Sequence, residues 1–465
     1  MKKVFKLLGF ALLLIVAIVV GYVAITFPPV MAGMAAKTMC SCVFVSGRSP
    51  QSVRDKELQV FPGLAEASID VNEQDQTVEA RILWRTSKAI FRKGLGCTLL
   101  AERSEQEVRS QRIVPADRPT VRQDTIDWPM GDRMPATPEL ADIDTVQLYA
   151  AIHEAFEERD PERPLNTSAV LVVYDGNLIA ERYAAGYGPE QPHMGWSMTK
   201  SITNALIGLL VKSGKLKVDE PVPFAEWQGD ERRAITLNQL LQASSGMEWK
   251  ESYFIPTSHF HRMFILSDDK AGYAASLPLA YPPGSRFQYS SGTSNMLSRL
   301  IRQTVGDEDY YRFPYDSLFY PLGMHHALIE PDASGTFVGS SYSYASGRDW
   351  ARFGLLYLND GIWNGERILP EGWVKYTVTP GSAAPRGEYG AQWHLNAGAP
   401  GNPASRKFAN LPTDVYWADG FEDQWVVVVP SHKLVVVRLG VSHHGFPIEN
   451  LVLGVMKSIK TTAMQ

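Results

Sequence analysis

Ser197 and Lys200 are the residues whose types and spacing best suit chemistry in this chain. They come just before a set of apolar positions whose spacing predicts an amphipathic helix: Ile202, Ala205, Leu206, Leu209 and Leu210. Residues three apart on a helix share one face, so the serine hydroxyl and the lysine amine can touch. A lysine that has lost its hydration can take the serine proton, and the free N–H groups of the helix N-terminus favour the developing oxyanion. The pair predicts nucleophilic catalysis by Ser197.

The same spacing occurs a second time, at Ser267 and Lys270. Two acidic residues, Asp268 and Asp269, separate this second pair, and we expect them to hold the lysine protonated. A serine at such a position also begins ordinary helices, so spacing alone does not identify a nucleophile. The assignment to Ser197 therefore depends on the rest of the chain.

A tyrosine in a second polar stretch is a candidate partner for the Ser197 and Lys200 pair. Tyr289 and Ser291 lie between a Pro-Pro-Gly turn at 282–284 and a helical pattern that begins near Asn295, so we expect both in a loop before a helix. A tyrosine beside such a pair can relay the proton to the leaving group, and a lysine ammonium nearby is expected to lower the pKa of that tyrosine. Taken alone, Tyr289 better suits a structural position at the edge of the core.

Four motifs in this order resemble the serine β-lactamase and penicillin-binding-protein superfamily, in its class C-like branch. They are Ser197-Met198-Thr199-Lys200, residues 235–246, Pro282-Pro283-Gly284 with Tyr289-Ser290-Ser291, and residues 419–424. That branch also holds esterases, D-aminopeptidases and 6-aminohexanoate-dimer hydrolases. The resemblance implies an α/β (α+β) fold, in which an antiparallel sheet flanked by helices meets a helical domain at the catalytic cleft.

The resemblance also implies roles for individual residues. Ser197 would form an acyl-enzyme, while Lys200 and Tyr289 would share the general acid and base roles. Backbone N–H groups of Ser197 and Gln424 would form the oxyanion hole. Water would then release the acid.

Two departures from the pattern of that superfamily bear on the substrate. Ser291 stands where many lactamases of this branch have asparagine, and Phe421-Glu422-Asp423 stand where Lys-Thr-Gly is usual. We expect these four residues to contact the substrate, with the acidic pair repelling an anion or attracting an amine. The chain is therefore expected to hydrolyse a small-molecule or peptide amide or ester rather than to be an efficient β-lactamase. A catalytically weak protein that binds cell-wall peptide or another ligand is the alternative.

Strand patterns at both ends of the main domain predict one antiparallel sheet. Two hairpins are expected, one from residues 169–174 and 178–183 and one from residues 424–429 and 434–439, with helical patterns between them. The hydrolase domain is expected over residues 142–465, and residues 28–141 are expected to form a small β-containing region and a linker. Strands within that region are predicted at 67–71, 77–83, 89–91 and 97–100.

An uncharged apolar run, residues 7–27, follows three lysines at the N-terminus. A run of this length spans a bilayer as a helix, which needs about 20 residues. The lysines predict a single-pass cell-membrane protein with residues 1–6 in the cytoplasm and the catalytic domain on the extracytoplasmic, periplasmic side. A cleaved signal peptide is the alternative, since the alanines at 32, 35 and 36 would suit a peptidase. Pro28 and Pro29 are expected to end the helix, and residues 30–55 to form a connector.

Composition and spacing bound the remaining possibilities. The formal net charge is -5 and no long basic run is present, so nucleic acid is not an expected partner. Three cysteines, Cys40, Cys42 and Cys97, allow one disulfide in an exported protein without specifying the pair. The cysteine and histidine spacings match no metal motif and no phosphate loop follows a strand, so we expect neither metal nor cofactor. The sequence does not indicate an oligomeric state.

Overall fold

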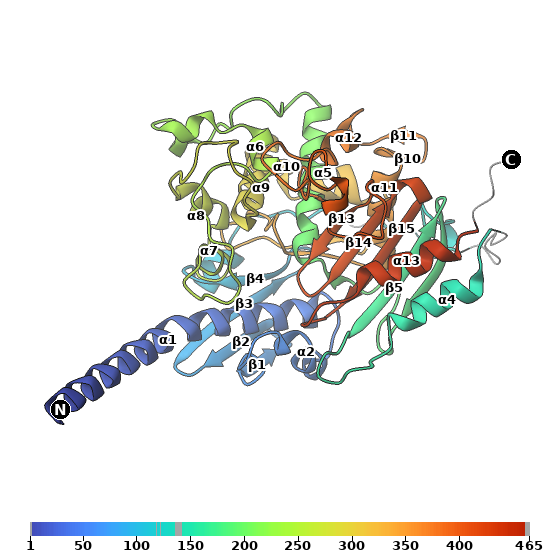
Figure 1. Ribbon diagram of the computed structural model, residues 1–465. Coiled ribbons are helices and arrows are strands. Elements are labelled where there is room, and N and C mark those ends of the chain that lie inside the picture. The colour runs from blue at the N-terminus through green and yellow to red at the C-terminus, as the bar shows by residue number, and fades with distance from the viewer. Residues whose placement is uncertain (1, 118, 121, 135–141, 461–465) are drawn as a thin grey trace.

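A six-stranded antiparallel sheet is the centre of the fold (Figure 1). The computed structural model describes residues 2–117, 119–120, 122–134 and 142–460. The strands follow the order β12-β13-β14-β15-β5-β6. Their bounds are β5 (Thr167–Tyr174), β6 (Asn177–Tyr183), β12 (His394–Leu395), β13 (Tyr416–Gly420), β14 (Gln424–Val429) and β15 (Leu434–Gly440). β15 pairs with β5 from Leu434 opposite Tyr174 onward, which confirms that the two predicted hairpins join into one sheet.

Helices cover both faces of this sheet, because its side chains alternate between two apolar cores. α4 (Thr145–Glu154) and α13 (Ile448–Ser458) pack together on one face, and α11 (Gly347–Leu358) lies on the other (Figure 1). Val172 and Val436 belong to the core under α4 and α13, whereas Leu171 and Val437 belong to the core under α11. A Cβ added at Gly354 of α11 would lie 2.5 Å from Val435, so only glycine allows this close approach.

A helical domain and several short strands lie between β6 and β12 in the chain. Its helices are α5 (Thr199–Lys212), α6 (Leu237–Leu241), α7 (His259–Phe264), α8 (Lys270–Ser276), α9 (Ser291–Val305), α10 (Asp307–Tyr310) and α12 (Trp373–Thr377). The short strands are β7 (His193–Met194), β8 (Leu328–Ile329), β9 (Ser343–Ala345), β10 (Ile362–Trp363) and β11 (Glu366–Arg367). α5 is buried along most of its length, which is more than one apolar stripe predicts. Its polar Asn204 accepts hydrogen bonds from Tyr357 Oη (2.6 Å) and Trp373 Nε1 (3.0 Å), so the helix holds the centre of the domain.

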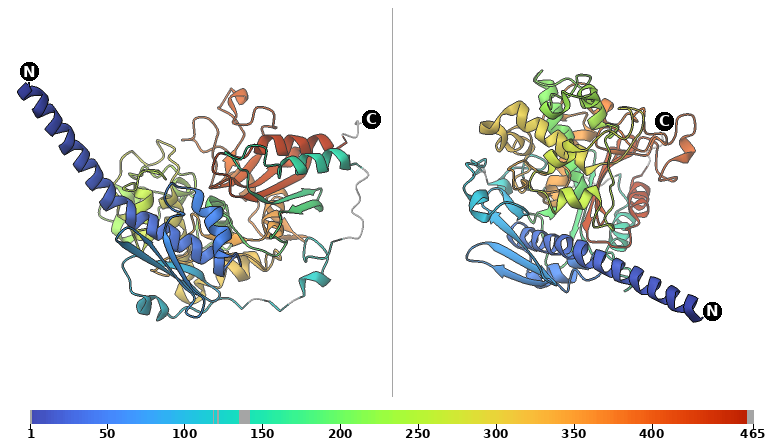
Figure 2. Two further views of the ribbon diagram at one scale, coloured as in Figure 1. Left: turned by 90° about the horizontal axis from the view of Figure 1, so that it is seen from below. Right: turned by 90° about the vertical axis from the view of Figure 1, so that its left-hand side faces the viewer.

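The N-terminal helix α1 (Lys2–Phe44) runs unbroken through both prolines. The prediction that Pro28 and Pro29 end the helix is wrong, as is the predicted connector that would follow them. Every residue from 30 to 42 is buried against the rest of the protein, and this packing offsets the backbone hydrogen bonds that the prolines cannot make. The preceding part of the helix projects away from the body (Figure 2). After α1 the chain forms α2 (Pro50–Asp55).

The predicted N-terminal β region is a four-stranded antiparallel sheet beside the buried half of α1. Its strands, β1 (Ser68–Asn72), β2 (Thr77–Ile82), β3 (Arg85–Arg92) and β4 (Gly96–Leu100), confirm the expected strand positions, and α3 (Glu105–Arg109) follows. A disulfide joins Cys40 of α1 to Cys97 of β4, and Cys42 is free and buried. Residues 135–141, where the linker is expected to end, lie outside the described residues.

A buried ion pair ties α1 to the main domain. Lys37 Nζ donates to Glu330 Oε2, and Ser41 Oγ donates to Glu330 Oε1 at 2.9 Å. The backbone N–H of Cys97 also donates to Glu330 Oε1, at 2.6 Å. One carboxylate from the main domain therefore joins the N-terminal helix and the N-terminal sheet.

Candidate active site

Ser197 lies in a 3₁₀ turn, η3 (Trp196–Met198), that leads directly into α5. Lys200 Nζ donates a hydrogen bond of 2.9 Å to Ser197 Oγ, so the two side chains share one face of the turn as predicted. Trp196 has a φ of 47°, a left-handed conformation that a tryptophan rarely adopts. Strain of this kind persists only where the surrounding structure enforces it, and here it presents Ser197 to a cleft.

Lys200 is buried, and three oxygen atoms surround its amine. Besides Ser197 Oγ, the Nζ donates to Ser340 O at 3.0 Å and to Ser291 Oγ at 3.3 Å. Burial lowers the pKa of Lys200 to about 8, although the carboxylates of Glu251 and Asp419 oppose the shift. A substantial fraction of Lys200 is therefore neutral at mildly alkaline pH and able to accept the Ser197 proton.

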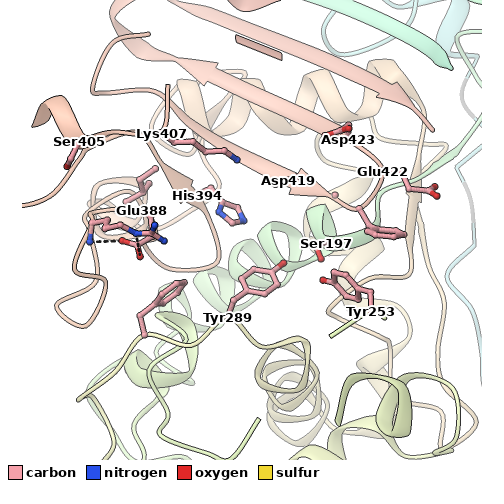
Figure 3. A pocket seen from close by; sticks show the side chains of 15 residues that line it. Ser197, Tyr253, Tyr289, Glu388, His394, Ser405, Lys407, Asp419, Glu422 and Asp423 are labelled. Atoms are coloured by element: carbon pink, nitrogen blue, oxygen red, sulfur yellow. Dashed lines mark hydrogen bonds and ion pairs between the residues drawn. The ribbon is translucent and has the colours of Figure 1, made fainter. Parts of the chain in front are cut away.

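Tyr289 reaches the same two residues from the segment before α9. Its ring centroid lies 4.8 Å from Lys200 Nζ, and its phenol points toward Ser197 (Figure 3). The expectation that the lysine lowers its pKa is wrong, because burial raises the pKa of Tyr289 well above its usual value and the Ser197 hydroxyl opposes this only in part. Tyr289 therefore remains a protonated phenol, which suits a hydrogen-bond donor rather than a base.

Glu251 belongs to the site but no sequence pattern indicated it. Its carboxylate accepts hydrogen bonds from Ser291 Oγ (2.7 Å) and from the Ser291 backbone N–H (3.0 Å). The expectation that Ser291 lies in a loop is wrong, because Ser290 caps α9 and Ser291 begins that helix. The Ser291 hydroxyl reaches Lys200. The segment around Glu251 has no helical or strand periodicity, and only the fold brings it to α9.

A cleft of about 710 Å³ opens beside Ser197 between the sheet and the helical domain (Figure 3). Its lining is largely aromatic and charged: Tyr253, Phe287, Tyr289, Arg386, Glu388, His394, Lys407, Asp419 and Phe421 are among the residues. The Phe421 ring packs edge-on against Trp196, with centroids 5.4 Å apart. Burial raises the pKa of Asp419 to about 6 and lowers that of His394 to about 3, so at neutral pH the cleft holds a carboxylate at Asp419 and a neutral imidazole at His394.

The acidic pair after Phe421 lines one end of this cleft, but both carboxylates have partners of their own. Glu422 Oε1 lies 3.1 Å from His443 Nδ1, and burial raises the pKa of Glu422 to about 7. Asp423 Oδ2 accepts a 2.7 Å hydrogen bond from the backbone N–H of Phe446. These contacts hold both side chains toward the segment after β15, on the far side of the cleft from Tyr289 (Figure 3).

Gln424 lies behind this end of the cleft, opposite Gly420 in the β13–β14 pair. Its side chain is held by the backbone of Gly440 and accepts from Gly440 N at 3.1 Å. Gly420 instead approaches the turn that carries Ser197, since a Cβ added there would lie 2.3 Å from Gly195 O. Gly420 and Phe421 are among the residues that line the cleft beside Ser197, and Gln424 is not.

The second serine and lysine pair is arranged differently. Lys270 Nζ donates to the backbone O of Ser267 at 3.1 Å, and Ser267 Oγ donates to Asp269 O at 3.0 Å. Burial lowers the pKa of Lys270 even though Asp332 and Asp268 raise it, so the acidic neighbours do not dominate as expected. The two side-chain functional groups of this pair are not joined, in contrast to Ser197 and Lys200.

This architecture and site match a known family. The family model described as Beta-lactamase matches residues 152–447, which is more than half of the chain. The chain belongs to the beta-lactamase family. Within the family, it is 26% identical to the 6-aminohexanoate-dimer hydrolase of Paenarthrobacter ureafaciens over 288 residues, which cover 57% of this chain and 72% of that protein.

Solved structures support the same fold for this beta-lactamase-family protein. A candidate 6-aminohexanoate-dimer hydrolase from Bacillus anthracis aligns with a TM-score of 0.54 and 22% identity, covering 71% of this chain and 87% of its own. A family VIII carboxylesterase aligns with a TM-score of 0.53 and 13% identity, covering 69% and 98%. These structures support the fold, while the family match and the hydrolase relative indicate a serine hydrolase in general terms.

Proposed function

We propose that this protein hydrolyses amide or ester bonds through an acyl-enzyme on Ser197. The observation that carries the proposal is the 2.9 Å contact between Lys200 Nζ and Ser197 Oγ, at the edge of the aromatic cleft. A buried amine with a pKa of about 8 is a competent base near neutral pH, and the serine hydroxyl is its hydrogen-bond partner.

In the proposed reaction, Ser197 Oγ attacks the substrate carbonyl carbon as Lys200 takes the hydroxyl proton. The Tyr289 phenol then gives a proton to the leaving amine or alkoxide and recovers one from Lys200. The backbone N–H of Ser197, with an N–H of the Gly420 and Phe421 segment in place of Gln424, stabilises the oxyanion. A water molecule, activated by the same groups, releases the acid and restores Ser197.

The residues that we propose to contact the substrate differ in what they offer it; they are Ser291, Phe421, Glu422 and Asp423. Phe421 forms an apolar surface beside Trp196. The Ser291 hydroxyl is hydrogen-bonded to both Lys200 and Glu251. Because Glu422 and Asp423 are already paired, we propose that Asp419 and Lys407 supply the charge that a substrate meets in the cleft.

We further propose that the protein is exported and stays attached to the membrane by α1, with the catalytic domain on the periplasmic side. Large apolar side chains such as Phe5, Leu12 and Ile18 are 62–73% exposed on the projecting part of α1, as a lipid-facing helix requires. One observation argues against cleavage at 32–36, because the alanines there have no exposed surface. The Cys40–Cys97 disulfide suits an oxidising compartment and so supports export.

Mass spectrometry after treatment with a fluorophosphonate tests the catalytic proposal. We expect one adduct on Ser197, and we expect Ser197→Ala to lose both the adduct and ester hydrolysis. Ser267→Ala is the matched control, since that serine also lies three residues before a buried lysine, and it should retain both. An intact protein that gives no adduct would favour the alternative, a binding protein for cell-wall peptide or another ligand.

A further inference from the structure

The segment 252–257, here called the Phe254 loop, exposes apolar side chains beside the active site. Phe254 is 79% exposed and Ile255 is 36% exposed. Near the start of the loop, Tyr253 lines the cleft. Glu251, the residue just before the loop, accepts a hydrogen bond from Ser291 Oγ. Large apolar groups exposed together at the edge of a site indicate a surface that meets another apolar phase.

This loop contacts α1 within the run that is predicted to cross the bilayer. The Tyr22 hydroxyl and Thr257 Oγ1 lie 2.8 Å apart. If residues 7–27 span the hydrocarbon, a rise of about 1.5 Å per residue places Tyr22 about 7.5 Å inside the boundary at Phe27. The Phe254 loop therefore reaches the depth of about 5–10 Å at which apolar groups of interfacial proteins rest.

The turn between β2 and β3 brings a second pair of exposed apolar residues toward the same depth in the bilayer as the Phe254 loop. Leu83 is 66% exposed and Trp84 is 63% exposed. Strand β3 lies along α1. The ring of Phe91 in β3 contacts the ring of Phe44 in α1. Ala89 in β3 is paired with Leu99 of β4, and Leu99 lies against Gly33 of α1.

From Ala89 the strand continues back to Trp84 for about 16 Å, toward the projecting half of α1. Tryptophan is the side chain most typical of the membrane–water interface.

Aromatic contacts connect the Phe254 loop to the nucleophile. The Phe254 ring lies 5.9 Å from the Phe61 ring, and Phe61 stacks on Phe421 at 6.3 Å. Phe61 and Phe421 also line a small apolar space that touches both Ser197 and Met34 of α1. The side of Ser197 that faces α1 is therefore apolar, whereas the opposite side opens to the charged cleft.

We propose that the Phe254 loop and the β2–β3 turn rest in the headgroup region of the bilayer beside α1, and that the site hydrolyses acyl esters or amides of amphiphiles that partition into the membrane. This inference rests on the proposed hydrolase function and on α1 as a retained anchor. The reaction is the one described above: Ser197 takes the acyl group, and water releases it as a carboxylic acid.

Depth measurements in the full-length protein test the membrane contact. An environment-sensitive fluorophore is attached to Phe254→Cys or to Val146→Cys, and the protein is reconstituted in vesicles of phosphatidylethanolamine and phosphatidylglycerol. Val146 is the matched control because it is also 79% exposed but lies on α4, at the opposite end of the body from the projecting helix (Figures 1 and 2). We expect lipid-borne quenchers to reach the label at 254 and not at 146. Equal quenching at the two positions overturns the proposal.

Activity on two esters tests the substrate class. Phe254→Asp should lower the rate on p-nitrophenyl dodecanoate held in these vesicles by about tenfold, the factor expected when a buried aromatic contact with lipid is lost. The rate on dissolved p-nitrophenyl acetate should stay within about twofold, and Val146→Asp should change neither rate. Equal losses on both esters, or no loss on either, overturn the proposal. If the unmodified protein forms no fluorophosphonate adduct on Ser197, the proposed hydrolase function itself is wrong.

Discussion

Ser291 Oγ donates a 2.7 Å hydrogen bond to Glu251 Oε1, although the two residues are 40 positions apart in the chain. The same Ser291 hydroxyl lies 3.3 Å from Lys200 Nζ, so the carboxylate reaches the proposed base through one hydroxyl. Glu251 also raises the pKa of Lys200 against the effect of burial. This carboxylate therefore influences both the position and the protonation of the lysine.

Replacing Glu251 by Gln should alter both properties of Lys200. The neutral amide removes a charge that stabilises the ammonium, so the pKa of Lys200 should fall and the pH–rate midpoint should move to lower pH. The weaker bond to Ser291 should also reduce kcat/KM at the plateau by about tenfold. The measurement is a pH–rate profile with a soluble ester. Glu248→Gln, a carboxylate on the same segment that is 53% exposed, should leave the profile unchanged. An unmoved midpoint would limit Glu251 to structural support.

The pH dependence of the unmodified protein should follow Lys200. Because the neutral amine is the active form, kcat/KM should rise with pH through about 8 and level off above it. Asp419→Asn should shift this midpoint downward, since the Asp419 carboxylate raises the pKa of the lysine. Asp175→Asn, at an exposed ion pair with Lys433, serves as the control. A rate that falls as pH rises from 6 to about 8 would exclude Lys200 as the base.

Tyr289→Phe should separate acylation of Ser197 from protonation of the leaving group. The ring that packs near Lys200 is retained and only the hydroxyl is lost, so kcat on an amide should fall by about 10²-fold or more with little change in KM. Fluorophosphonate labelling of Ser197 should persist, because its leaving group needs no proton. Tyr389→Phe, which keeps a ring packed edge-on against Tyr289, should retain amide turnover. Full amide turnover in Tyr289→Phe would show that the phenol is not the acid.

Lys37→Met should destabilise the whole protein, because it leaves the buried Glu330 carboxylate without its counter-charge. The expected loss in the free energy of unfolding is about 3–5 kcal/mol, measured by denaturation in detergent. Lys37→Met combined with Glu330→Gln should recover part of this loss, since no unpaired charge remains. Lys217→Met, which removes an exposed ion pair with Glu220, should have no measurable effect. If the single and double variants lose equal stability, the ion pair is not what joins α1 to the main domain.

The sequence by itself determined the features that depend on local spacing. Three-residue spacing on a helical turn brought Ser197 and Lys200 together. Alternation of apolar residues marked strands of the N-terminal sheet, and continuous apolar runs marked the buried strands of the main sheet. The order of the motifs along the chain was sufficient to indicate the beta-lactamase family, whose model matches residues 152–447. Each of these properties can be recognised within a short segment or from the order of short segments.

The tertiary structure decided the features that depend on residues far apart. It placed Glu251 on Ser291, paired Cys40 with Cys97, and buried residues 30–42 so that a helix continues through Pro28 and Pro29. It also set the pKa of Tyr289, because the loss of hydration in a packed cleft outweighs the hydrogen bond with Ser197. Burial and long-range contacts arise only when the chain folds, so they cannot be predicted from the spacing of residues within a short segment.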